Sequence, residues 1–144
     1  MALKSVGRTH WEGDLLSGSG TASLDSGAAG PLPVTWKART EEHGSLTSPE
    51  ELIAAAHSSC YSMAFSSALA KNETPPTSLD VQATATFVPG EGITLMELEV
   101  VGHVEGISEE TFLDLAETAK NGCPVSRALA GNVEITLEAR LAHA

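Results

Sequence analysis

The segment that most constrains how this chain folds is the run TSPEELIAAAHSSCYSMAFSSALAK at positions 47–71. Ser48 is a favoured residue for capping a helix, Pro49 suits the first helical position, and Glu51 completes a Ser-x-x-Glu capping box. Prolines at positions 75–76 follow the run and cannot continue a helix. The sequence therefore predicts one long helix over 49–71, built mostly from small residues.

Strand patterns lie on both sides of this helix. Apolar and β-branched residues alternate with polar ones, or are broken by Gly and Ser, over residues 9–24, 34–40, 79–88, 93–106 and 132–141. The cluster at 17–20 predicts a hairpin turn, and the turn at 89–92 predicts that the strands beside it pair antiparallel.

Two further helices are expected late in the chain. The first is capped by Ser108 and stops at Gly122, and a third, short helix begins at Cys123 and Pro124. This order of elements predicts an α+β fold with an antiparallel sheet packed on two main helices. A length of 144 residues favours one domain spanning 1–144.

The charge of the chain limits its partners. Lys and Arg number 8 against 19 acidic residues, a formal net charge of −11, which disfavours nucleic acid and anionic membranes. No run resembles a leader of about 7–15 apolar residues or a membrane span of about 20. A cytoplasmic location is expected, where the two cysteines are free thiols, metal ligands or a redox pair.

Cys60 and Cys123 are the two cysteines, and each has more than one interpretation. Cys60, within the small-residue helix, is either inert packing or a working thiol. Cys123 precedes Pro124 at a helix N-terminus, which favours thiolate, so by position alone Cys123 is the better candidate for a lowered pKa. A metal site joining His57 and Cys60 with Cys123 or His43 is a weaker alternative because paired Cys-x-x-Cys motifs are absent. A packing role or a hydrogen bond near the site suits His57 better.

Arg39 and Glu50 are the charged residues that best fit a thiol site. Arg39 can supply the cation that Cys60 needs, or it can pair on the surface with Glu41 or Glu42. Glu50 can orient a guanidinium, or it can be a solvated acid near the helix N-terminus. Ten residues of helix separate Glu50 from Cys60 by about 15 Å. If both serve one site, either the helix starts later or Glu50 comes from a second subunit.

The motifs together resemble the OsmC/Ohr family of bacterial thiol peroxidases. The resemblance lies in TSPEELIAAAHSSCYSMA and NGCPVSRAL, with GRTHWEGDLLSGSGTASL near the start and EITLEARL near the end. HSSC and CPVSRAL are closer to the OsmC branch than to the Ohr branch. The resemblance implies that Cys60 is the peroxidatic cysteine, Cys123 the resolving cysteine, Arg39 the cation at the thiolate and Glu50 its partner. It also implies an intertwined homodimer with two sites at the subunit interface.

The activity implied by the resemblance is reduction of organic hydroperoxides and, less well, of hydrogen peroxide, as part of a stress response. Cys60 passes through sulfenic acid to a Cys60–Cys123 disulfide, which an external dithiol or a lipoylated protein re-reduces without metal, haem or flavin. The family thus assigns the nucleophile to Cys60, whereas helix position favours Cys123, and Arg8 is the alternative to Arg39. Two other functions stay open: a thiol sensor or disulfide carrier without peroxidase turnover, and a non-enzymatic ligand-binding dimer.

Overall fold

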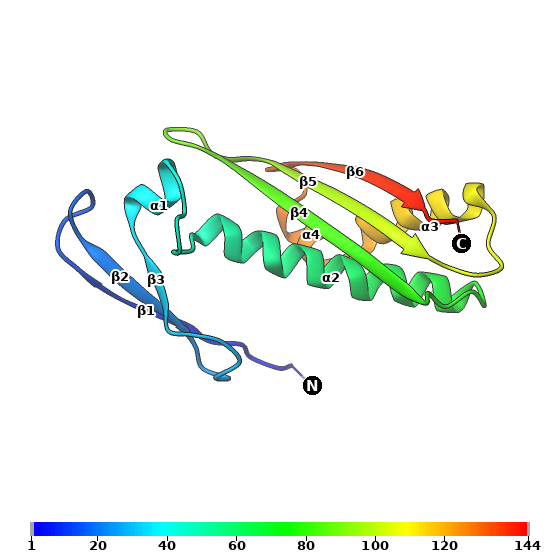
Figure 1. Cartoon of the computed structure of the whole chain (residues 1–144), viewed down its shortest axis with the longest axis horizontal. Coiled ribbons are helices and arrows are strands. Elements are labelled where there is room, and N and C mark those ends of the chain that lie inside the picture. The colour runs from blue at the N-terminus through cyan, green and yellow to red at the C-terminus, as the bar shows by residue number, and fades with distance from the viewer. Residues whose placement is uncertain (1, 144) are drawn as a thin grey trace. The chain divides into compact units, whose positions relative to one another are not determined.

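A computed structural model describes residues 2–143, and the chain divides into two compact units, Met1–Leu52 and Ile53–Ala144 (Figure 1). Each unit contains a three-stranded sheet. The long helix α2 (Pro49–Lys71) begins in the first unit and continues in the second. The predicted α+β class is confirmed, and the single domain over 1–144 stays a prediction.

The first unit is a small antiparallel sheet followed by a helical turn. Its strands β1 (Gly7–Glu12), β2 (Ser19–Leu24) and β3 (Leu32–Val34) lie in that order, so the predicted hairpin at 17–20 is confirmed. The predicted strand over 34–40 is wrong beyond Val34, because residues Trp36–Thr40 form helix α1. In the antiparallel pairing of β2 and β3, Val34 lies opposite Gly20, close to the start of β2. Residues after Val34 therefore have almost no β2 residues left to pair with. Thr35 instead caps α1 by accepting a hydrogen bond from the Ala38 backbone N–H at 3.1 Å.

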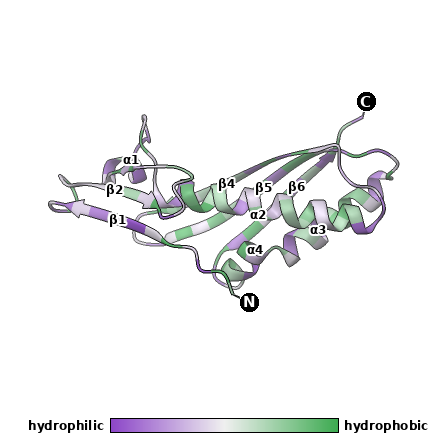
Figure 2. Ribbon diagram, turned by 90° about the horizontal axis from the view of Figure 1, so that it is seen from below, coloured by the Kyte–Doolittle hydropathy of each residue, from purple (hydrophilic) through white to green (hydrophobic). Residues whose placement is uncertain are grey.

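Helix α2 has the predicted bounds, with one difference at its cap. The backbone N–H of Glu51 donates to Ser48 Oγ at 3.1 Å, as a capping residue requires. In a capping box the Glu51 carboxylate would accept from the backbone N–H of Ser48. Here it accepts instead from the hydroxyl Oγ1 of the preceding residue, Thr47, at 2.6 Å. Figure 2 shows α2 largely green to white, whereas β1 is mostly purple. Small and apolar residues all round α2 leave it without a strong polar face.

The second unit packs helices on a mixed sheet. Strands β4 (Ser78–Val88) and β5 (Gly92–His103) form the predicted antiparallel hairpin. Strand β6 (Glu134–Leu141) pairs with β5 in parallel, so the expectation of a wholly antiparallel sheet is wrong here. Helices α3 (Glu109–Gly122) and α4 (Pro124–Leu129) come between β5 and β6, and such a crossover returns the chain in the same direction.

The core of this unit lies between α2, α3 and one face of the sheet. On α2 the fully buried residues recur every four positions, at His57, Tyr61, Phe65 and Leu69. The Phe65 ring lies 5.7 Å from that of Tyr61 and 5.1 Å from that of Phe112 on α3, centroid to centroid. Apolar residues of β5 complete the cluster, which also contains Cys123. The end of α3 at Gly122, as predicted, therefore places Cys123 in the core.

Gly102 on β5 provides a test of this packing. A Cβ at Gly102 would lie 2.6 Å from Phe112 Cε2 and 3.2 Å from Leu79 Cδ2. Gly102→Ala is therefore expected to lower the free energy of unfolding by about 1–3 kcal/mol through overpacking. Chemical denaturation measures this, with Gly122→Ala as the control because a Cβ there meets no atom within 4 Å. Equal stabilities for the Gly102→Ala variant and the unmodified chain would contradict the packing described.

Among residues 2–143, none of the helices combines the length and the apolar character needed to cross a membrane.

Candidate functional site

The structure brings Cys60 and Cys123 together within the second unit. Cys60 lies on α2, and Cys123 is the residue between α3 and α4. Both are free thiols, and Cys60 packs against the buried cluster that contains Cys123, close enough for Cys123 to raise the pKa of Cys60. Cys60 is partly exposed, whereas Cys123 is completely buried. The two sulfurs are therefore adjacent, and Cys60 is the one that a reagent in solution reaches first.

The start of helix α4 acts on Cys60. Burial raises the pKa of Cys60, the backbone N–H of Val125 lowers it, and Cys123 raises it. Val125 is the second residue of α4, and the Cys123 side chain makes no capping hydrogen bond at this helix end. The N-terminal N–H that was expected to favour a Cys123 thiolate thus favours a thiolate at Cys60 instead. None of these groups carries a positive charge, so Cys60 still needs a cation to become a strong nucleophile at neutral pH.

A buried hydrogen bond lies next to the two cysteines. His57 Nε2 and Ser126 Oγ are 2.7 Å apart, and both residues are buried. This confirms the expectation of a hydrogen bond at His57. Burial lowers the pKa of His57, which keeps the imidazole neutral. In the described part of the chain, no three His, Cys, Asp or Glu side chains are grouped so that they could hold a metal ion.

Burial of a neutral His57 should make stability depend on pH. The unfolded chain binds a proton near pH 6.5, whereas the folded chain does so only at lower pH. Stability from this group is therefore present above pH 6.5 and is lost as the pH falls, by at most about 1.4 kcal/mol per pH unit. Chemical denaturation at about pH 7.5 and about pH 5.5 measures the free energy of unfolding at each pH. Its decrease between the two pH values should be smaller in His57→Gln than in the unmodified chain. An identical decrease in the free energy of unfolding in the variant would contradict a buried neutral imidazole.

Arg39 and Glu50 form an ion pair within the first unit. Arg39 Nη2 lies 2.8 Å from Glu50 Oε1, and Arg39 Nε lies 2.9 Å from the same oxygen. Glu50 is only 5% exposed, so it is not a solvated acid. The Arg39 guanidinium also lies over the Trp36 ring, with Cζ 5.8 Å from its centroid. Of the two interpretations of Glu50, the structure supports the one in which it orients a guanidinium.

The elements that carry this pair differ partly from expectation. Arg39 lies on helix α1 and not at the end of a strand. Helix α2 begins at Pro49, which excludes a later helix start as the way to relate Glu50 to Cys60. The alternative cation, Arg8, pairs with Asp25 at 2.8 Å on the surface, where its side chain is 70% exposed. Arg39 is therefore the better candidate for a site residue.

An apolar cavity of about 340 Å³ lies beside Arg39 in the first unit. Arg39 is the charged residue of its lining, and the apolar part of the lining includes Trp11, Leu15, Val34, Trp36, Pro49 and Leu52. Sequence reasoning did not identify Trp11 and Leu15 as site residues. The sequence feature that could have identified them is a large apolar residue within an otherwise polar segment. In the structure Trp11 is 37% exposed and Leu15 is 53% exposed. This cavity can take an apolar group next to a guanidinium.

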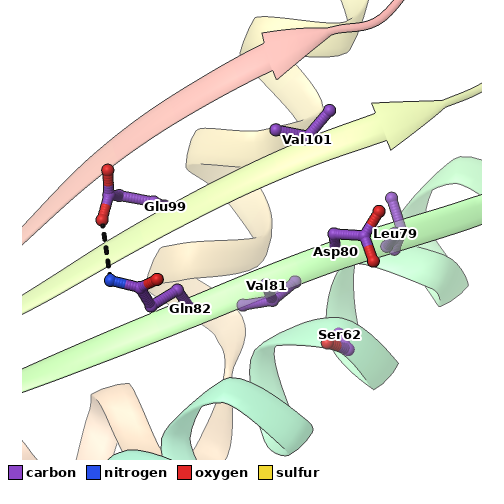
Figure 3. A pocket seen from close by; sticks show the side chains of 7 residues that line it. All are labelled: Ser62, Leu79, Asp80, Val81, Gln82, Glu99 and Val101. Atoms are coloured by element: carbon purple, nitrogen blue, oxygen red, sulfur yellow. Dashed lines mark hydrogen bonds between the residues drawn. The ribbon is translucent and has the colours of Figure 1, made fainter.

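Another hollow, of about 590 Å³, lies at the β4 edge of the second unit and has a different character (Figure 3). Gln82 Nε2 donates to Glu99 Oε2 at 3.3 Å there, and Asp80 and Ser62 also line it. Its lining includes no cysteine, histidine or basic residue. It therefore offers neither a nucleophile nor a cation for thiol chemistry.

Comparison with known proteins adds a family and a fold. Residues 42–138 match the family model described as OsmC-like protein. The chain is 41% identical to the Escherichia coli protein named peroxiredoxin OsmC, over 98% of this chain and 99% of that protein. It is 30% identical to the Bacillus subtilis organic hydroperoxide resistance protein OhrA, over 88% of this chain and 86% of that one. An OsmC-like protein of unknown function from Vibrio cholerae, whose structure is solved, has the same fold, with a TM-score of 0.74 and 17% identity over 96% of this chain and 99% of that one.

Proposed function

Because this chain belongs to the OsmC-like protein family, we propose that it reduces organic hydroperoxides to alcohols with Cys60 as the nucleophile. It is an oxidoreductase of the peroxidase class. The observation that carries the proposal is the contact between a partly exposed Cys60 and a buried Cys123. This arrangement suits a thiol that is oxidised by substrate and a second thiol that resolves the product.

The reaction has two oxidative steps and a reductive one. The Cys60 thiolate attacks the distal peroxide oxygen, the O–O bond breaks, and Cys60 becomes a sulfenic acid. The leaving alkoxide takes up the proton that the Cys60 thiol gave up on ionising, and departs as an alcohol. Cys123 then attacks the Cys60 sulfur, water leaves, and a Cys60–Cys123 disulfide forms. An external dithiol restores both thiols by exchange. A small dithiol or a lipoylated protein is the expected donor, and no resident cofactor takes part.

Arg39 is assigned to the first step. Burial raises the pKa of Cys60, so a cation is required to make its thiolate available at neutral pH. Glu50 fixes the Arg39 guanidinium in one orientation through a pair that is mostly shielded from water. The pair acts within a homodimer with sites at the subunit interface. Because α2 begins at Pro49, Glu50 lies too far along the helix from the Cys60 of its own chain, so the partner chain contributes Arg39 and Glu50.

Substrate preference follows from the cavity beside Arg39. Its apolar lining favours the organic part of a hydroperoxide, whereas hydrogen peroxide has no apolar group to bury there. The cytoplasm is the proposed location, since thiols that cycle between oxidised and reduced forms need a reducing compartment.

Steady-state peroxide consumption with dithiothreitol or dihydrolipoamide as donor tests the proposal. The purified protein should consume cumene hydroperoxide with a kcat/KM at least about tenfold above that for hydrogen peroxide, a preference equivalent to burying about two methylene groups. Catalase-free buffer and the alkylated protein give the background rates. Consumption of hydrogen peroxide alone, or none of either, would contradict the proposed function.

A thiol sensor without turnover is the second candidate. The complete burial of Cys123 favours it, because a disulfide to a buried sulfur is shielded from a dithiol donor and would persist after one oxidation. One oxidation per chain, with no further consumption when dithiol is added, would identify the sensor.

A further inference from the structure

A second pair of side chains joins the same two elements as the cysteines. His57 lies three residues before Cys60 on α2, and Ser126 lies three residues after Cys123 on α4. Residues three apart on a helix share a face. The His57–Ser126 hydrogen bond, at 2.7 Å, therefore runs beside the contact between the two sulfurs. This pair has no part in the attack of Cys60 on peroxide.

The hydrogen bond is the buried attachment of a very short helix. Helix α4 has six residues, and Ser126 is the one that is buried. His57 is 0% exposed, and its other ring nitrogen, Nδ1, has no hydrogen-bond partner among residues 2–143. Separating the two side chains would leave buried polar groups unpaired, which costs free energy. This cost keeps His57 and Ser126 together. The pair thus fixes the start of α4, including Cys123, against α2.

We propose that the His57–Ser126 hydrogen bond is a positioning device that holds the Cys123 sulfur in reach of Cys60 while the disulfide forms. The proposal rests on the proposed function, and it assigns the pair to the second step rather than to attack on peroxide. His57 and Ser126 touch neither peroxide nor the reacting sulfurs in this role, so both are positioning residues.

The step that the pair controls is the condensation of two sulfur groups. The Cys123 sulfur donates an electron pair to the Cys60 sulfur, the S–S bond forms and the S–O bond of the sulfenic acid breaks. The sulfenic hydroxyl leaves as water with the proton of the Cys123 thiol. The Cys123 sulfur is oxidised and the sulfenic sulfur is reduced by one electron equivalent each, so both reach the disulfide level and no outside oxidant is needed. Because the rate depends on how the two sulfurs are placed, a displacement of about 1 Å can cost about a hundredfold.

Another buried hydrogen bond supplies a matched control. Tyr61, also completely buried on α2, donates from Oη to the Ala116 carbonyl of α3 at 3.0 Å. Tyr61→Phe removes one buried hydrogen bond next to Cys60 in sequence but leaves the attachment of α4 intact. A general loss of stability should therefore appear in both Tyr61→Phe and Ser126→Ala, whereas a positioning effect should appear only in Ser126→Ala.

Rapid mixing of the reduced protein with cumene hydroperoxide, quenched at intervals, tests the proposal. A sulfenic-acid reagent counts Cys60 sulfenic acid, and alkylation with mass analysis counts the disulfide. Ser126→Ala and His57→Phe should each slow disulfide formation by at least about tenfold, and by more than they slow the first oxidation. Their effects should not add in the double variant, since both remove one interaction. Ser126→Thr, which keeps the hydroxyl, should recover most of the rate.

Two results would overturn the proposal: an unchanged disulfide rate in Ser126→Ala, or an equal slowing in Tyr61→Phe. If the unmodified protein forms no disulfide with peroxide, the proposed function fails, and the pair is tested instead in a glutathione redox buffer. There, Ser126→Ala should lower the equilibrium constant for the Cys60–Cys123 disulfide by at least about tenfold, or about 30 mV. An unshifted equilibrium would again overturn it.

Discussion

Cys60→Ser is expected to abolish peroxide consumption, with a loss of at least about a thousandfold in turnover. A serine hydroxyl is almost wholly protonated at neutral pH, and neither the Val125 N–H nor a nearby cation can make it a nucleophile comparable to a thiolate. Consumption of cumene hydroperoxide with a dithiol donor measures the loss. Ser59→Ala is the control, because Ser59 is the exposed neighbour whose hydroxyl only donates to the Ala56 carbonyl on the same helix.

Cys123→Ser separates the two thiols. This variant should still react once with peroxide, and it should accumulate a Cys60 sulfenic acid that a trapping reagent labels. Trapping at Cys123 in the Cys60→Ser variant would reverse the assignment of roles. That reversed assignment is the one that helix position alone favours, so the pair of variants decides between two specific readings of the sequence.

Arg39→Ala is expected to slow oxidation of Cys60 by about 10²–10³-fold, the cost typical of removing one preorganised group that stabilises charge. The rate should also shift to higher pH, because without the cation the pKa of Cys60 stays raised by burial. Single-turnover oxidation of the reduced protein across a pH series measures both effects. Arg39→Lys should recover only part of the rate, since an ammonium cannot pair with Glu50 through two parallel hydrogen bonds.

Stability has to be separated from chemistry in this variant. Removing Arg39 leaves the nearly buried Glu50 carboxylate unpaired, which destabilises the fold. The double variant Arg39→Ala/Glu50→Gln should recover stability but not the oxidation rate. Arg8→Ala, which removes only an exposed pair with Asp25, is the matched control. Wild-type oxidation rates in Arg39→Ala, or a comparable loss in Arg8→Ala, would move the cation to another residue.

The long helix was predictable because its cap is local. Ser48, Pro49 and the small residues after them all indicate a helix, and the structure forms one with those bounds. The segment 34–40 was not predictable, because Val34, Trp36 and Ala38 alternate over too few residues to separate a strand from a helical turn. Whether a strand is formed there depends on a partner strand, and β2 begins too close to Val34 to provide one.

Strand β6 shows a second limit of sequence patterns. Its strict alternation predicts a strand with one buried face, and that is what forms. Alternation is the same in parallel and antiparallel pairs, so it says nothing about direction. The parallel pairing with β5 follows from the crossover through α3 and α4, which is a property of the whole topology.

The site was predictable in part. Local reasoning identified Cys60, Cys123, Arg39 and Glu50 as candidates, but a redox pair of Cys60 with Cys123 was one of three possibilities until the resemblance to a family favoured it. Periodicity cannot bring together two residues so far apart in the sequence, whereas the fold does so by ending α3 against α2. The role of Glu50 could not be settled from the sequence either, because its burial depends on how Arg39 on α1 packs against the start of α2. Ser126 carried no signal that set it apart from other serines.

The most direct test of the central claim is a titration of free thiols against cumene hydroperoxide, followed by peptide mapping of the oxidised protein. One equivalent of peroxide per chain should remove both thiols and give one disulfide, between Cys60 and Cys123 of the same chain. Addition of a dithiol should restore both thiols. Persistence of the two thiols after one equivalent of peroxide, or a disulfide that joins Cys60 of two chains, would contradict the account.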